Sequence, residues 1–272
     1  MKQRVITALL LTPAAIALIL IAPSILFSLV IGTLCLLASW ELTRLAGLRS
    51  RPLRAVLLAM CGGVFVLLWL GADSIGGWIV IGAGCAWWLL ALLWLRHFSF
   101  GATPTRENIA LKLIGGAFVV LPAWTALIQM HRGQPAPHTW PLYALMLVWA
   151  ADTFAYLSGR RWGTTKLAPS ISPGKTIAGV YGALVGAGLV ALLGGWWLGV
   201  RDVTLLGLVV LALITVCFSV VGDLFESMLK RHANVKDSGT LFPGHGGAFD
   251  RLDGVFAALP ARPLQMIRKS AA

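Results

Sequence analysis

Residues 209–231 read VVLALITVCFSVVGDLFESMLKR, so an uninterrupted apolar run passes directly into a stretch of charged side chains. The run predicts a membrane-spanning helix, and the charges predict that its end reaches the membrane surface. The polar stretch continues to residue 253 and holds five of the 10 acidic residues of the chain: Asp223, Glu226, Asp237, Asp250 and Asp253. A segment this polar on an apolar chain predicts metal-assisted chemistry on phosphates at a membrane surface.

The composition of the chain is that of an integral membrane protein. Of its 272 residues 58% are hydrophobic and 12% are charged, whereas soluble domains carry about 25% charged residues. The net charge of +12 could indicate a nucleic-acid partner. Cytoplasmic loops of membrane proteins also collect Lys and Arg, which explains the charge better, so we expect no nucleic acid. The four cysteines lie in apolar runs without CxxC spacing, which argues against zinc.

Eight apolar runs approach the length that a membrane-spanning helix needs. They cover residues 5–22, 24–40, 55–71, 76–95, 111–130, 140–158, 177–199 and 203–221. We therefore predict an all-α fold, a polytopic transmembrane helical bundle of about eight spans. It forms a single domain over residues 1–272, with 222–254 as its catalytic segment. The first run lacks a clear cleavage site and is expected to be a retained helix.

The distribution of Lys and Arg predicts the orientation. With the N-terminus inside, the loops on one side hold nearly all basic residues, and the opposite loops hold only Arg132 and Arg201. An excess of Lys and Arg marks the cytoplasmic side. The catalytic segment is thus expected to face the cytoplasm, and a loop at 131–139 to lie outside, with His131 and His138 solvated.

The first candidate group follows the last apolar run. Asp223, Glu226 and Lys230 are spaced i, i+3 and i+7, which places them on one helical face with Ser227 beside them. Two carboxylates one turn apart can share a hard cation. The alternative is a solvated helix end with a Glu226–Lys230 ion pair.

The second group is PGHGGAFDRLD, residues 243–253. Its glycines let the backbone approach a ligand closely, and exposed N–H groups in such a turn can bind an anion. Asp250 and Asp253 would share one face of a helix that starts there. A surface turn followed by a charged helix start is the alternative, but it does not explain His245 between glycines.

Two further segments carry charge near apolar runs. Asp152 interrupts a span, so it either faces a polar cavity or snorkels from the span's end. In KLAPSISPGKT, residues 166–176, the last three residues resemble half of a phosphate loop. Pro169 stands where that loop needs glycine, so we do not predict a P-loop NTPase. Lys175 could bind phosphate as a point charge, or Lys166 and Lys175 could only set the topology.

Together these segments resemble the bacterial phosphatidate cytidylyltransferases, the CDP-diacylglycerol synthases. The match runs SMLKR, four residues, KDSG, two residues, FPGHGG, two residues and DRLD, which fits residues 227–253. VWAAD at 148–152, the 166–176 segment, KQRVITA near the N-terminus and WEL at 40–42 are also similar to the family. The resemblance covers almost the whole chain.

The resemblance implies transfer of a cytidylyl group from CTP to phosphatidate in the bacterial inner membrane. The partners of such a protein would be CTP, phosphatidate and membrane lipids, and its cofactor would be Mg²⁺. A second cation such as K⁺ and a homodimer are left open. The implied metal ligands are Asp223 and Asp250 in the first place, and Glu226 and Asp253 in the second. The catalytic set adds Lys230. The substrate-binding set is Asp152, Lys175, Ser227, Arg231, Lys236, Asp237, Gly244, His245, Gly246, Gly247 and Arg251.

Alternatives are a cytidylyltransferase for another lipid phosphate, a non-catalytic homologue and a transporter. The chain also departs from the family pattern at Ala248, Gly254 and Ile177-Ala178. The family ends in another apolar span, but here the run from Val255 ends at residues 261–263, Ala-Arg-Pro. We therefore expect the tail to return to the cytoplasmic surface and the helix with the last two acids to be less well anchored.

Overall fold

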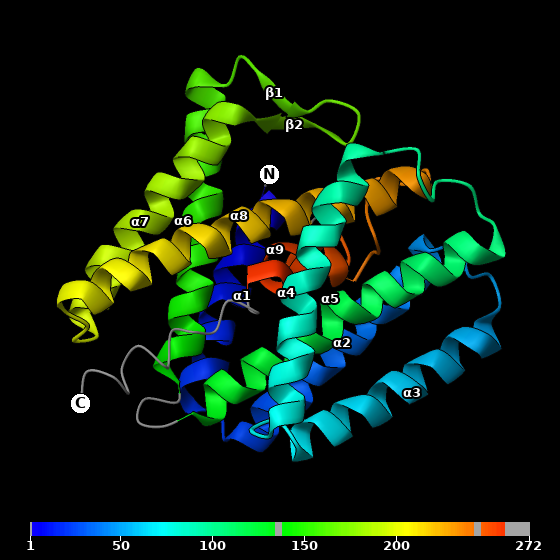
Figure 1. Ribbon diagram of the computed structural model, residues 1–272, viewed down its shortest axis with the longest axis horizontal. Coiled ribbons are helices and arrows are strands. Elements are labelled where there is room, and N and C mark those ends of the chain that lie inside the picture. The colour runs from blue at the N-terminus through cyan, green and yellow to red at the C-terminus, as the bar shows by residue number, and fades with distance from the viewer. Residues whose placement is uncertain (1, 134–137, 242–245, 259–272) are drawn as a thin grey trace.

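The computed structural model describes residues 2–133, 138–241 and 246–258, with side chains from residue 9 onward. It is a bundle of long helices with a small antiparallel hairpin at one end, which confirms the predicted all-α fold (Figure 1). The helices are α1 (Lys2–Ile21), α2 (Ser24–Leu45), α3 (Arg51–Leu70), α4 (Ile75–Arg96), α5 (Arg106–Arg132), α6 (Thr139–Trp162), α7 (Ile177–Trp197), α8 (Asp202–His232) and α9 (Phe249–Ala258). The strands β1 (Lys166–Ala168) and β2 (Ser172–Thr176) connect α6 to α7.

The predicted spans correspond to the first eight helices. Within the described residues, the 7 helices from α2 to α8 are long and apolar enough to cross a membrane, and α1 contributes the shorter apolar segment Leu9–Ile21. Many leucines on their outer faces are exposed, as expected of side chains that contact lipid. The protein is therefore an integral membrane protein with a polytopic bundle.

Small residues let neighbouring helices approach closely. A Cβ atom at Gly84 of α4 would lie 2.7 Å from Cγ of Pro122 in α5. A Cβ atom at Gly115 of α5 would lie 2.6 Å from the ring of Trp87. Lipid is as apolar as the helices, so close van der Waals packing at such positions, rather than the hydrophobic effect, holds a bundle together.

Helix α9 lies inside the bundle, against α8, α5 and α2 (Figure 1). Gly222 of α8 makes this approach possible, because a Cβ atom there would lie 2.8 Å from the carbonyl oxygen of Asp253. Phe249 and Phe256 are buried on the same short helix. The expected loss of a final span concerns residues 261–263, which lie outside the described residues.

The prediction of a solvated His131 is wrong. Helix α5 continues to Arg132, beyond the apolar run, and carries the ring of His131 into the bundle. There it stacks on Phe27 with ring centroids 3.8 Å apart, and Nδ1 lies 3.1 Å from Oγ of Ser24. His138 is partly buried, with Nδ1 3.1 Å from Nε2 of His131.

We predict that Gly84→Ile destabilises the bundle because the side chain would separate α4 from α5. Inserting bulk into a packed contact costs about 1–3 kcal/mol. The measurement is thermal unfolding of the purified protein in detergent. Gly82→Ile is the matched control, since a Cβ atom at Gly82 of the same helix meets nothing within 4 Å. Equal unfolding temperatures for the two variants would contradict this packing.

Candidate active site

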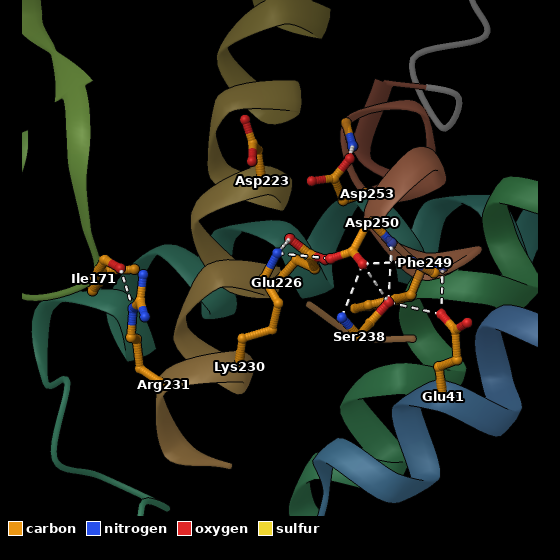
Figure 2. A network of polar contacts seen from close by, with 12 residues as sticks. Glu41, Ile171, Asp223, Glu226, Lys230, Arg231, Ser238, Phe249, Asp250 and Asp253 are labelled. Atoms are coloured by element: carbon orange, nitrogen blue, oxygen red, sulfur yellow. Dashed lines mark hydrogen bonds and ion pairs between the residues drawn. The ribbon is translucent and has the colours of Figure 1, made fainter. Parts of the chain in front are cut away.

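Three carboxylates from two helices converge at one end of α8. Asp223 and Glu226 project from α8, Asp253 projects from α9, and one oxygen of each lies within 4.8 Å of the others (Figure 2). We call these three residues the acidic triad. Asp223 and Glu226 share one face of α8, as their helical spacing predicts, and the structure packs α9 with Asp253 against α8.

The described residues neutralise the negative charge of the acidic triad only in part. Glu226 is 1% exposed, and its buried Oε1 has no hydrogen-bond partner there. Burial raises the pKa of Asp253 well above its usual value, and the negative charge of Asp223 raises it further. An uncompensated buried carboxylate is costly, so a cation among these oxygens would stabilise all three. Clustered carboxylate oxygens suit a hard divalent ion such as Mg²⁺, so the triad fits the predicted metal.

Asp250 lies beside the triad but has other partners. Its Oδ1 accepts a hydrogen bond from Nζ of Lys230 at 2.8 Å, and its Oδ2 accepts from the N–H groups of Ser238 at 2.8 Å and Gly247 at 2.7 Å. Burial alone would raise its pKa, but Glu226, Lys230 and Gly247 together hold that pKa well below the usual range. Metal ligation by Asp250 stays a prediction, and its occupied oxygens favour the acidic triad instead.

Lys230 connects Asp250 to the triad. Its Nζ lies 2.7 Å from Oε2 of Glu226 and 2.8 Å from Oδ1 of Asp250. The predicted Glu226–Lys230 ion pair therefore exists, but it is mostly buried and shared rather than solvated. One ammonium group offsets the repulsion between carboxylates of α8 and α9.

Three N–H groups of the glycine-rich turn have partners within the protein. Gly247 donates to Asp250, and Ala248 and Phe249 donate to Oε1 and Oε2 of Glu41 at 3.1 and 2.9 Å. The protein's own carboxylates therefore occupy these three N–H groups, while the predicted roles of Gly246 and Gly247 in substrate binding stay predictions. Gly246 has a φ of 85°, which favours glycine. Gly244 and His245 lie outside the described residues.

Glu41 is a site residue that sequence reasoning missed. It lies on α2, is 8% exposed and also accepts a hydrogen bond from Oγ of Ser238 at 2.7 Å. The available signal was an acid that interrupts an apolar run, the argument that singled out Asp152. It could not identify partners about 200 positions away in the sequence.

A cavity of about 360 Å³ adjoins the triad. It lies between α6, the hairpin, α7 and α8, and Asp223 is part of its wall. Asp152, Lys166 and Lys175 also line it, and Lys175 forms an ion pair with Asp223. Asp152 thus faces a cavity, as one of its two interpretations proposed.

The remaining predicted residues lie around this centre. Arg231 donates from Nε to the carbonyl oxygen of Ile171 in the hairpin connection at 3.3 Å (Figure 2). Ser227 is partly buried on α8, whereas Lys236, Asp237 and Arg251 are exposed. None of these four is among the residues that line the cavity. Their predicted contacts with substrate stay predictions.

Comparison with known proteins decides the family. The model of the cytidylyltransferase family matches residues 2–265. The chain belongs to the cytidylyltransferase family. It is 38% identical to a phosphatidate cytidylyltransferase of Pseudomonas aeruginosa over 96% of this chain and 94% of that protein. It is 35% identical to a phosphatidate cytidylyltransferase of Haemophilus influenzae over 96% of each chain. The family resemblance inferred from the spaced signature is confirmed.

We predict that Lys230→Met strongly destabilises this cytidylyltransferase family member. The substitution keeps most of the side-chain volume but leaves Glu226 and Asp250 without their shared cation. Breaking a buried ion pair from one side costs about 3–5 kcal/mol. Thermal unfolding in detergent should fall well below that of Lys236→Met, which alters an exposed lysine. Similar unfolding of both variants would show that Lys230 does not bind the two helices together.

Proposed function

We propose that this protein transfers the cytidylyl group of CTP to phosphatidate and releases pyrophosphate, forming CDP-diacylglycerol. Two relatives that align with almost the whole chain are named phosphatidate cytidylyltransferases. The observation that carries the proposal is the acidic triad beside a cavity with both cationic and apolar walls, at one end of a membrane bundle. Carboxylates that can hold a divalent ion, beside cations that can bind phosphate, form the arrangement that nucleotidyl transfer needs.

The cavity suits an amphipathic phosphate ester. Its polar part presents Lys166, Lys175 and Arg160. Its apolar part is formed by Ala151, Ala155, Val180, Ala183, Val216 and Val220. A lipid phosphate could place its headgroup against the cations while its glycerol and acyl chains run along the apolar helices. This division favours a lipid phosphate over a soluble sugar phosphate as acceptor.

In this reaction the protein has to position the substrates and neutralise their charge, and it need not form a covalent intermediate. An oxygen of the phosphatidate phosphate attacks the α-phosphorus of CTP, and the bond to the β-phosphate oxygen breaks. Asp223, Glu226 and Asp253 would hold Mg²⁺, which when bound neutralises charge on the nucleotide and on the leaving pyrophosphate. Lys175 would exchange its partner Asp223 for a substrate phosphate, and Lys166 would neutralise a second oxygen.

The site would face the cytoplasm of a bacterial inner membrane. The hairpin lysines and the last turn of α8 lie on the side where nearly all basic loop residues gather. That asymmetry supports a cytoplasmic location for the triad, where CTP is available. The predicted K⁺ and homodimer stay predictions.

The test is synthesis of CDP-diacylglycerol by the purified protein from radiolabelled CTP, phosphatidate and Mg²⁺. We expect chelation to abolish turnover and Asp253→Asn to reduce kcat at least about 100-fold, since charge and ligand geometry are both lost. Asp73→Asn, in the exposed turn between α3 and α4, is the control and should retain activity. Wild-type protein that forms no CDP-lipid under these conditions would refute the proposed activity.

The same assay tests the orientation. In sealed inside-out membrane vesicles, externally added CTP should be consumed, and in right-side-out vesicles it should not. Consumption only in the right-side-out preparation would place the acidic triad on the outer face.

A further inference from the structure

We propose that Glu41 is a positioning residue that fixes α9, and with it Asp253, relative to the two acids of α8. This inference rests on the proposed metal-dependent function. Glu41 is not part of the acidic triad and does not line the cavity. Any effect on the reaction must therefore act through the residues that it holds.

Glu41 caps α9 from another helix. The first N–H groups of a helix have no partner within it, and a carboxylate near them is stabilised by the helix dipole. Ala248 precedes α9 and Phe249 begins it, and both N–H groups donate to Glu41. Helix α2 thereby supplies the cap that α9 would otherwise need from its own sequence.

Ser238 extends this contact to Asp250. Its hydroxyl lies 2.7 Å from Oε2 of Glu41 and 2.9 Å from Oδ2 of Asp250 (Figure 2). A hydroxyl carries one proton, so it donates to one carboxylate at a time, while the Ser238 N–H holds Asp250 continuously. Arg44, one turn after Glu41, donates to the carbonyl oxygen of Ser238. The end of α2 therefore contacts both the side chain and the backbone of Ser238.

Two glycines of the signature make room for Glu41. A Cβ atom at Gly239 would lie 2.7 Å from Cδ of Glu41 and 3.2 Å from Cα of Gly247. A Cβ atom at Gly247 would collide with both carboxylate oxygens of Glu41 and with the Ser238 hydroxyl. The absence of these two side chains is thus explained by a carboxylate of the protein itself.

The consequence for the triad is geometric. Asp253 lies one turn beyond the capped end of α9, and its backbone packs against Gly222 of α8. Loss of the cap would let the start of α9 move, and the Asp253 oxygens would shift relative to Asp223 and Glu226. Partners that orient metal ligands typically contribute a factor of about 10–100 to metal affinity.

The experiment measures Mn²⁺ binding by electron paramagnetic resonance in detergent, without CTP or lipid. We expect the Mn²⁺ Kd to rise about 10–100-fold in Glu41→Ala. Glu41→Gln should fall in between, because its amide oxygen still accepts one of the two backbone N–H groups. The kcat should fall more in Glu41→Ala than in Glu41→Gln, with little change in the KM for CTP in either variant.

Thr43→Val is the matched control. Thr43 is buried on the same turn of α2, and its hydroxyl accepts a hydrogen bond from Nε of Arg54 on α3 at 2.9 Å. This variant should lower the unfolding temperature, as Glu41→Ala does, yet bind Mn²⁺ like the wild type. A general loss of stability would weaken Mn²⁺ binding in both variants equally, and that result would overturn the proposal.

Two other outcomes separate this inference from the proposed function. Wild-type affinity for Mn²⁺ in Glu41→Ala, in a protein that makes CDP-lipid, would overturn the positioning role alone. Absence of Mn²⁺ binding in the wild type would overturn the proposed metal site and, with it, this inference.

Discussion

The contact between α8 and α9 brings like charges together inside a membrane bundle, and the other contacts of the site depend on how those charges are compensated. Asp223 and Glu226 lie so close to Asp253 that three ionised carboxylates would repel one another strongly without cations or hydrogen-bond donors between them. Gly222 lets the two helices approach this closely. A protein that only needed stability could have placed apolar side chains here at less cost.

Compensation takes two forms. Glu41 and Asp250 accept hydrogen bonds from the protein's own backbone and from Ser238, and Asp250 also contacts Lys230. The triad has Lys230 at Glu226 and Lys175 at Asp223, yet it retains a buried Glu226 oxygen without a described partner. Glu41 and Asp250 therefore have their partners within the protein, and they hold the backbone at residues 247–249 and Ser238 in place. A further cation would stabilise the triad, which is the property expected of a site that binds metal and phosphates together.

Local sequence patterns predicted most of the fold. They also predicted which acids of the site share a helical face, but not their partners. Apolar runs located the membrane helices because backbone groups in lipid must be satisfied within a helix. The i, i+3 spacing of Asp223 and Glu226 correctly placed them on one face. Similar spacing placed Asp250 and Asp253 on α9, but it could not show that their partners differ.

What the sequence could not predict depends on contacts between distant segments. The glycine-rich turn was interpreted as a ligand site because its N–H groups looked free, whereas Glu41 occupies two of them from far along the chain. His131 was assigned to a solvated loop because nothing local showed that it stacks on Phe27. In both cases a polar side chain near an apolar run found its partner through helix packing.

The most direct test of the central claim is anomalous X-ray scattering from crystals of the protein grown with Mn²⁺. We expect an anomalous peak within coordination distance of Asp223, Glu226 and Asp253, with Asp250 still bound to Lys230 and Ser238. A peak held by Asp250 while Asp253 points away, or no peak in this region at saturating Mn²⁺, would contradict it.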